Sequence, residues 1–251
     1  MEEKIYYKSK KFKLCGLLNK QNNSDEIVVL CHGFLGNKNE SGLFDLYVDS
    51  FNKNKINSFR FDFTSHGESE GKDIDINITN EISDLEITLD MLKVKGFNKF
   101  ILVGSSMGCT IVSLINHSKY DLRGLILLYG ALMFDKIPLA NFSKDELNEA
   151  KNNGYISREI LCSNIKIPYQ LFKDVTNYKP YVNLQKLDMP ILFIHGKKDR
   201  VVPYQISEDV NKMCKNSNLI LIENDGHVFR KNKDSRQVVI DKSLEFIKNN
   251  M

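Results

Sequence analysis

The sequence predicts an α/β protein with a mostly parallel, eight-stranded sheet and helices on both faces. Short apolar runs alternate along the chain with segments of helical periodicity, which is the pattern of such a sheet. Several of the runs are apolar at every position, as in strands buried on both faces. The eight predicted strands are Ile5–Tyr7, Leu14–Leu18, Ile27–Cys31, Phe59–Phe63, Phe100–Val103, Leu125–Tyr129, Ile191–His195 and Leu219–Glu223.

The connections between these runs predict where the helices lie. No helical pattern separates the first two runs, so we expect an antiparallel hairpin at one edge of the sheet. Ile82, Leu85, Leu89 and Leu92 recur at helical spacing and share one face. A second such face lies near the C-terminus, at Ile240, Leu244 and Ile247.

The segment between the sixth and seventh runs is roughly twice as long as the other connections, which is typical of a lid or binding element. It contains the polar, helix-like stretch Asn141–Lys151, followed by an Asn-Asn-Gly turn signal. We interpret residues 135–185 as a cap, and residues 1–134 and 186–251 as the core. An extra packing helix without a ligand role is the alternative. Aromatic residues of this cap are candidates to line a substrate pocket, although core packing explains them equally well: Tyr169, Phe172, Tyr178 and Tyr181.

Composition excludes several classes of protein. Apolar residues make up 42% and charged residues 27% of the 251, which argues against disordered and fibrous chains. The net charge of +3 and the scattered lysines argue against nucleic acid as a partner. No apolar run reaches the roughly 20 residues that span a bilayer, and the N-terminus lacks an apolar signal core. We therefore expect a cytoplasmic protein; the oligomeric state stays open.

The cysteines indicate neither a disulfide framework nor a metal site. Their number is odd, and no pair has the Cys-x-x-Cys spacing. This pattern fits a reducing compartment and predicts no metal. The five are Cys15, Cys31, Cys109, Cys162 and Cys214.

The strongest chemical signal is the Gly-Ser-Ser-Met-Gly motif at Gly104–Gly108. It follows a predicted strand and precedes a helical pattern, the context in which G-x-S-x-G forms a nucleophile elbow. Ser106 would project above the sheet at the start of that helix, where the helix dipole favours negative charge. The alternative is a tight turn with a solvent-facing serine.

A serine nucleophile needs a base, and His227 is the best candidate. It lies in a loop directly after the last predicted strand, whereas His195 lies within a strand and suggests a structural role. Asp199, in the loop after the seventh strand, is the best candidate to orient the base. Asp135, after the sixth strand, is an alternative acid, and Asp225 is too close in sequence to His227.

Two further loops belong to the same edge of the sheet. In the run His32–Gly36, the backbone N–H of Phe34 is the predicted first donor of an oxyanion hole, and that of Met107 is the second. The loop after Asp62 is rich in glycine and short polar residues, which indicates a structural role for its His66.

These motifs, in this order and at these spacings, resemble the α/β-hydrolase superfamily along nearly the whole chain. The run His-Gly-Phe-Leu-Gly-Asn-Lys and the length of the insertion most resemble carboxylesterases of the cinnamoyl/feruloyl esterase and monoacylglycerol lipase kind. The resemblance implies a serine hydrolase that cleaves esters of small acyl or aryl substrates through an acyl-enzyme, without a cofactor. The cap would then shape specificity.

Two residues depart from this pattern. Ser105 stands where these esterases usually have histidine, which suggests a neighbouring subgroup that includes thioester hydrolases. Cys109 stands where a second glycine is common, and we expect a small buried side chain rather than a nucleophile. A thioesterase or another acyl hydrolase or transferase with the same triad is therefore the alternative, and a non-catalytic ligand-binding member of the fold is a further one.

Overall fold

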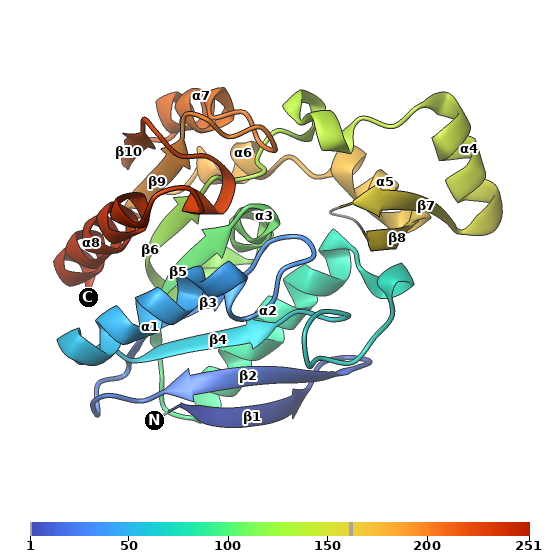
Figure 1. Ribbon diagram of the computed structural model, residues 1–251. Helices are drawn as coiled ribbons and strands as arrows, with labels where there is room; N and C mark the ends of the chain where they lie inside the picture. The colour runs from blue at the N-terminus through green and yellow to red at the C-terminus, as the bar shows by residue number, and fades with distance from the viewer. Residues whose placement is uncertain (1, 161–162) are drawn as a thin grey trace.

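The computed structural model describes residues 2–160 and 163–251, and it confirms the predicted eight-stranded sheet (Figure 1). The strands run in the order β1-β2-β4-β3-β5-β6-β9-β10. The first two pairings are antiparallel and all others are parallel. The strands are β1 (Glu3–Lys8), β2 (Lys13–Asn19), β3 (Glu26–Cys31), β4 (Ser58–Asp62), β5 (Lys99–Ser105), β6 (Asp121–Leu128), β9 (Ile191–Gly196) and β10 (Ser217–Ile222).

Helices cover both faces of the sheet because its strands are apolar on both faces. Along β3, Val28 and Leu30 pack on one side, while Ile27 and Val29 pack on the other. The first side is covered by α1 (Leu43–Asn54) and α8 (Lys233–Asn250), and the second by α2 (Ile78–Val94), α3 (Met107–Leu114) and α7 (Gln205–Met213). None of the helices in the described part of the chain is long and apolar enough to span a bilayer.

The long connection between β6 and β9 folds outside the main sheet (Figure 1). The predicted polar helix is present as α4, and it begins with a capping box at Ser143 and ends at Gly154 in a left-handed conformation. A separate two-stranded antiparallel sheet, which the sequence did not predict, follows it. The elements are α4 (Lys144–Asn153), β7 (Tyr155–Ile160), β8 (Ser163–Pro168), α5 (Tyr169–Asn177) and α6 (Pro180–Leu184).

Short 3₁₀ turns complete the described chain. Apart from His117–Lys119, which lies between α3 and β6, they lie in connections that follow the carboxyl ends of strands, the edge at which the candidate site lies. They are Glu40–Gly42, Asp73–Asp75, His117–Lys119, Phe134–Lys136, Pro138–Ala140 and His227–Phe229. Of the cysteines, Cys162 lies outside the described residues, and the others have free thiols.

Candidate active site

Ser106 occupies a strained turn between β5 and α3. Its backbone adopts φ 51° and ψ −114°, a conformation that non-glycine residues rarely adopt. The turn is held by a hydrogen bond from the Ser106 N–H to the Leu128 carbonyl oxygen (2.9 Å) and by one from the Ala131 N–H to the Ser106 carbonyl oxygen (3.1 Å). The backbone thus fixes the position from which the Ser106 side chain projects.

The two glycines of the motif are required by close backbone contacts. A Cβ atom at Gly104 would lie 2.7 Å from the Cys109 nitrogen, and one at Gly108 would overlap the Cys31 carbonyl oxygen. Helix α3 can therefore pack tightly against β3 and β5 only if both positions are glycine. This is the physical reason for the G-x-S-x-G spacing in this chain.

Asp199 and His227 lie together at the same edge of the sheet. Asp199 follows β9, His227 follows β10, and Asp199 Oδ2 lies 2.7 Å from His227 Nδ1. The second carboxylate oxygen accepts hydrogen bonds from the N–H groups of Val201 (2.8 Å) and Val202 (2.9 Å). The carboxylate is therefore fixed, and it in turn orients the His227 ring.

His195 also contacts this carboxylate, which sequence reasoning did not anticipate. Its Nε2 lies 3.0 Å from the Val202 carbonyl oxygen and 3.2 Å from Asp199 Oδ2, and its Nδ1 lies 2.7 Å from the Ser207 hydroxyl. Because a carbonyl only accepts, Nε2 carries a proton. The fully buried His195 thus donates to Asp199 from behind.

These contacts set the charge of the acid. Burial by itself would raise the pKa of Asp199, but the hydrogen bonds from His195 and His227 outweigh it and hold that pKa well below its usual range. Asp199 is therefore ionised under all ordinary conditions. An ionised acceptor at Nδ1 leaves Nε2 of His227 as the basic nitrogen.

The turn after β3 crosses closely over the nucleophile. A Cβ atom at Gly33 would lie 2.9 Å from the Ser106 Cβ atom, so this approach requires glycine. The turn is closed by a hydrogen bond from the Gly36 N–H to the Gly33 carbonyl oxygen (2.9 Å). Phe34 and Met107, the predicted oxyanion donors, line the same cavity as Ser106.

His32 secures this turn from below. Its Nε2 accepts a hydrogen bond from the Phe63 N–H (3.0 Å), and its Nδ1 lies 2.8 Å from the Gly33 carbonyl oxygen. Burial lowers the pKa of His32 well below its usual range, so the ring is neutral. A neutral ring with its proton on Nδ1 satisfies both contacts.

The cavity at Ser106 has a volume of about 130 Å³ and an apolar wall. Phe134, Ala140, Phe142 and Val175 also line a larger cavity of about 740 Å³ beside it. The wall of the smaller cavity consists of Phe34, Ser106, Met107, Ala131, Phe134, Ile137, Ala140, Phe142, Ile167, Leu171, Val175, Val201 and Val202.

The four predicted aromatic residues have different positions. Phe172, Tyr178 and Tyr181 line the larger cavity, whereas Tyr169 lines neither and packs against Phe172 with ring centroids 6.4 Å apart. Phe142 lines both cavities and is not among the four aromatic residues predicted from the sequence. It is a lone aromatic residue in a polar stretch, which gives no periodic signal.

The alternative acids have other positions. Asp135 is exposed on a 3₁₀ turn at the rim of the larger cavity. Asp225 is buried and accepts hydrogen bonds from the N–H groups of Gly226, Lys231 and Asn232, so it organises its own loop. Neither carboxylate is hydrogen-bonded to His227.

The Cys109 thiol is buried under the elbow. Its Sγ atom lies 3.1 Å from the Gly104 carbonyl oxygen and 3.3 Å from that of Leu128. Burial raises the pKa of this thiol well above its usual range. Since the thiolate is the reactive form of cysteine, Cys109 is a packing residue.

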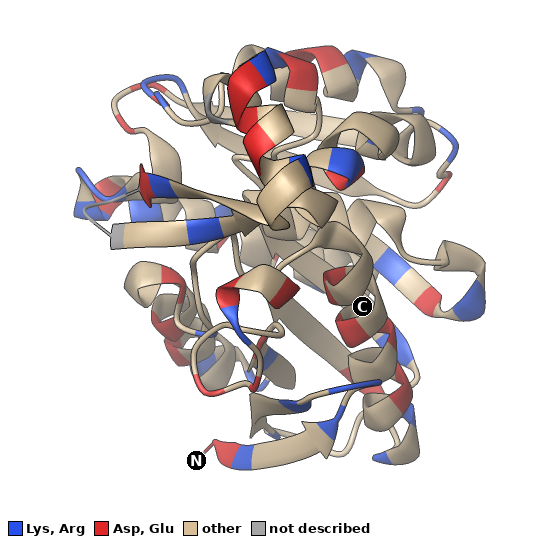
Figure 2. Cartoon of the chain, turned by 90° about the vertical axis from the view of Figure 1, so that its right-hand side faces the viewer, with Lys and Arg blue, Asp and Glu red and all other residues tan. Residues whose placement is uncertain are grey.

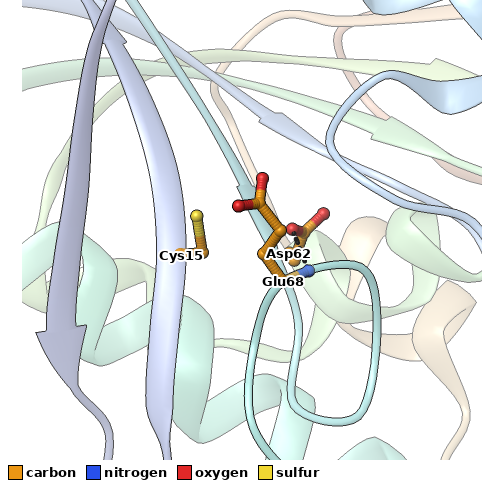
Figure 3. Close-up of side chains that lie close together, drawn as sticks. All are labelled: Cys15, Asp62 and Glu68. Carbon is orange, nitrogen blue, oxygen red and sulfur yellow. Dashed lines mark hydrogen bonds between the residues drawn. The ribbon is translucent and has the colours of Figure 1, made fainter.

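One cluster of ligand-type side chains in the described part of the chain includes none of the three predicted catalytic residues: Cys15, Asp62 and Glu68 approach one another at the carboxyl end of β4 (Figure 3). The Lys38 ammonium group lies 2.6 Å from Asp62 Oδ2 and 2.8 Å from Glu68 Oε1. Hydrogen bonding to Lys38 lowers the pKa of Glu68 to about 2. Lys38 thus supplies the positive charge that the two carboxylates need. Lys38, Asp62 and Glu68 form an ion-pair network that holds the loop after β4 in place.

Figure 2 marks the charged residues along the chain. Positions of Lys and Arg are interspersed with positions of Asp and Glu on the helices and loops that face the viewer there.

Comparison with known proteins shows which families the chain resembles. Residues 22–166 match the family model described as serine aminopeptidase, S33, and residues 153–251 match the prolyl oligopeptidase family. "Putative esterase/lipase 2" of Mycoplasma genitalium is 28% identical over 89% of both chains. Human monoacylglycerol lipase ABHD6 is 23% identical over 85% of this chain and 74% of its own.

Solved structures show the same fold. Est1E from Butyrivibrio proteoclasticus with bound ferulic acid superimposes with a TM-score of 0.84 over 98% of both chains, at 22% identity. The predicted resemblance to the α/β-hydrolase superfamily is thereby confirmed. Because the first family model covers more than half of the 251 residues, this chain belongs to the serine aminopeptidase S33 family of α/β-hydrolases.

Proposed function

We propose that the protein is a serine hydrolase that cleaves carboxylic esters of small acyl or aryl substrates through an acyl-enzyme. The observation that carries this proposal is the position of Ser106. It lies on a strained turn at the start of a helix, in the wall of an apolar cavity, at the sheet edge where Asp199 holds His227. A serine in this setting has the surroundings that nucleophilic catalysis needs.

The reaction follows from the roles of the three residues. Ser106 Oγ attacks the ester carbonyl while Nε2 of His227 takes its proton. Asp199 accepts from Nδ1–H and stabilises the imidazolium that forms. The N–H groups of Phe34 and Met107 hold the oxyanion. His227 then protonates the leaving alcohol and activates the water that releases the acid.

The cavity favours esters over the peptides that the family name suggests. An aminopeptidase must hold the charged amino terminus of its substrate, which calls for an acidic or strongly polar group near the nucleophile. Ser106 is the one polar side chain among the described residues that line its cavity. The names of the relatives, an esterase/lipase and a monoacylglycerol lipase, point the same way.

Residues 135–185 serve, in this proposal, as a cap that sets acyl or aryl preference. Phe142, Leu171 and Val175 come from this segment and form one wall of the Ser106 cavity. A cytoplasmic location completes the proposal, and the odd number of cysteines without a Cys-x-x-Cys pair supports it.

Labelling with a fluorophosphonate probe tests the proposal. Wild type, Ser106→Ala and the exposed-site control Ser118→Ala are labelled, and turnover of p-nitrophenyl esters is compared with that of amino-acid p-nitroanilides. Labelling and ester turnover should vanish in Ser106→Ala and persist in Ser118→Ala. A folded wild type that is not labelled would refute the nucleophile, and faster hydrolysis of the anilides would refute the ester assignment.

A further inference from the structure

Three consecutive residues behind the active site have left-handed backbone conformations. The φ angles of Glu40, Ser41 and Gly42 are 43°, 54° and 81°. For the first two residues this conformation is unfavourable, and it persists only where the surroundings hold it in place. The contacts of this turn therefore show what it is held for.

The Glu40 side chain joins the turn after β3, His32–Gly36, here called the oxyanion turn, to the nucleophile elbow at Gly104–Gly108. Its carboxylate is buried, with 5% of the residue exposed. Oε2 accepts a hydrogen bond from the Gly33 N–H (3.1 Å), and Oε1 lies 2.7 Å from the Ser105 hydroxyl. A Cβ atom at Gly36 would lie 2.7 Å from Oε2, so the turn is shaped around this carboxylate.

The hydroxyl of Ser105 connects Glu40 to a third residue. It lies 2.8 Å from the Tyr129 hydroxyl as well as 2.7 Å from Glu40. The Ser105 hydroxyl therefore links the Glu40 carboxyl group to the Tyr129 hydroxyl. The Tyr129 ring in turn packs against the His227 ring, with centroids 4.6 Å apart.

Ser41 ties the same turn to the His227 loop. Its hydroxyl accepts a hydrogen bond from Arg230 (2.5 Å), and its carbonyl oxygen accepts one from Arg236 (3.2 Å). The Arg236 Nε atom also donates to the Phe229 carbonyl oxygen (3.0 Å). Adjacent residues of one turn thus contact the oxyanion turn, the elbow and the loop of the base.

Burying the Glu40 carboxylate is energetically unfavourable because the group loses its hydration. An apolar side chain of similar size would fill the same space without this desolvation penalty. Burial raises the pKa of Glu40, while its hydrogen bonds with Ser105 and Gly33 and the nearby His227 and Arg230 act in the opposite direction. The hydrogen bonds go to the two segments that carry the predicted oxyanion donors.

We propose that Glu40 is a positioning residue, which fixes the amide of Phe34 relative to that of Met107 by binding Gly33 on one side and Ser105 on the other. This inference rests on the proposed function. Ser105, where similar esterases have histidine, is then the elbow's partner for Glu40. The carboxylate does not touch the substrate, and its effect appears only where negative charge develops on the carbonyl oxygen.

The test compares Glu40→Ala, Glu40→Gln, Ser105→Ala and the double variant Glu40→Ala/Ser105→Ala. Asp49→Asn, an exposed carboxylate on α1, is the control. Loss of an oxyanion-hole donor lowers kcat by about 10²-fold, and we expect that loss in Glu40→Ala with KM changed by less than about threefold. In Glu40→Gln the amide still accepts from Gly33 and donates to Ser105, so kcat should recover to within about tenfold of wild type.

The remaining outcomes decide the proposal. If Glu40 acts through Ser105, the double variant loses no more activity than Glu40→Ala, because the two changes break one connection. The proposal is overturned if the loss of kcat in the double variant equals the product of the two single losses. It is also overturned by an unchanged kcat in Glu40→Ala, or by a Glu40→Gln variant as slow as Glu40→Ala.

Two complications are resolved within the same experiment. If Glu40→Ala does not fold, Ser105→Ala must by itself lower kcat by about tenfold at unchanged KM, and a normal kcat there overturns the proposal. A wild type without Ser106-dependent labelling refutes the proposed function. An active wild type whose Glu40 variants have the same kcat refutes only the role of Glu40.

Discussion

The loops at the carboxyl edge of the sheet and the segment between β6 and β9 are built in different ways. At the sheet edge, buried polar groups have several partners each: the Asp199 carboxylate alone contacts two histidines and two backbone N–H groups. In the inserted segment, α4 buries a single residue, Ala150. In the proposed function, chemistry thus lies on the loops at the carboxyl edge of the sheet, here called the frame, while specificity lies in an inserted segment whose helix α4 is lightly packed.

The inserted segment is attached to the core through α5. Asp174 of α5 lies 3.3 Å from the Thr79 N–H at the start of α2, and Leu171 and Phe172 join the core on that side of the sheet. These contacts hold α5, and α4 lies further out (Figure 1). Changes in the two regions should therefore affect different kinetic constants.

The largest expected effect belongs to the frame. Asp199→Asn should lower kcat by about 10⁴-fold, because an amide no longer holds the His227 tautomer that accepts the proton of Ser106. Asp135→Asn is the matched control, since Asp135 is exposed and is the alternative acid. Steady-state kinetics on a p-nitrophenyl ester measure both, and a larger loss in Asp135→Asn would reassign the acid.

A smaller effect on kcat is expected at His195, which donates a hydrogen bond to Asp199. His195→Ala removes a donor to Asp199 and leaves Ser207 without its partner, so kcat should fall by about 10- to 100-fold. The free energy of unfolding should fall by about 1–3 kcal/mol, the cost of leaving a buried polar group unpaired. Kinetics and urea unfolding measure these effects, with His117→Ala as control. Unchanged kcat would return His195 to a purely structural role.

The inserted segment should respond differently. Phe142→Ala removes a wall shared by both cavities, so KM for esters with long or aromatic acyl groups should rise by about tenfold while acetate esters change by less than about twofold. Val238→Ala, on the exposed side of α8, is the control. An equal loss with acetate would show that this segment also positions the catalytic residues.

The smallest expected effect is a pH dependence of stability. Burial lowers the folded-state pKa values of His32 and His66, so the unfolded chain binds more protons and stability falls as the pH drops below about 6.5. Each histidine contributes up to ~1.4 kcal/mol per pH unit in that range. Urea unfolding at pH 7.5, 6.5 and 5.5 measures the slope, which His66→Gln should reduce. A slope that His66→Gln leaves unchanged would point to another titrating group. Residues 135–185 contain no histidine, so the inserted segment contributes none to this slope.

The frame could be predicted from the sequence because its signals are local. The apolar runs and the Gly104–Gly108 motif reflect backbone contacts within a few residues, and they gave the strands and the elbow. The pairing of Asp199 with His227 followed from their order after neighbouring strands, and the structure places them in contact. Local signals therefore suffice where the fold itself forces residues together.

Side-chain networks between distant segments could not be predicted in this way. His195 appeared structural because its strand is buried, and nothing in the sequence indicates that its ring reaches Asp199. Glu40 and Ser105 are 65 positions apart and become partners only when β3 and β5 pair. The β7–β8 hairpin lies outside the main sheet, and its sequence lacks the continuous apolar run that marked the other strands.

The pairing of β6 with β9 has a consequence for how this architecture diversifies. Leu125 lies opposite Ile191 and Leu128 opposite Ile194, so the chain leaves the sheet and returns to it at adjacent strands. Because the two strands are parallel, their connection must cross from one edge of the sheet to the other, but beyond that minimum its length can vary at a modest cost in loop entropy. In the proposed function, grafting a foreign insertion between these strands is thus a route to new substrate ranges on the same sheet.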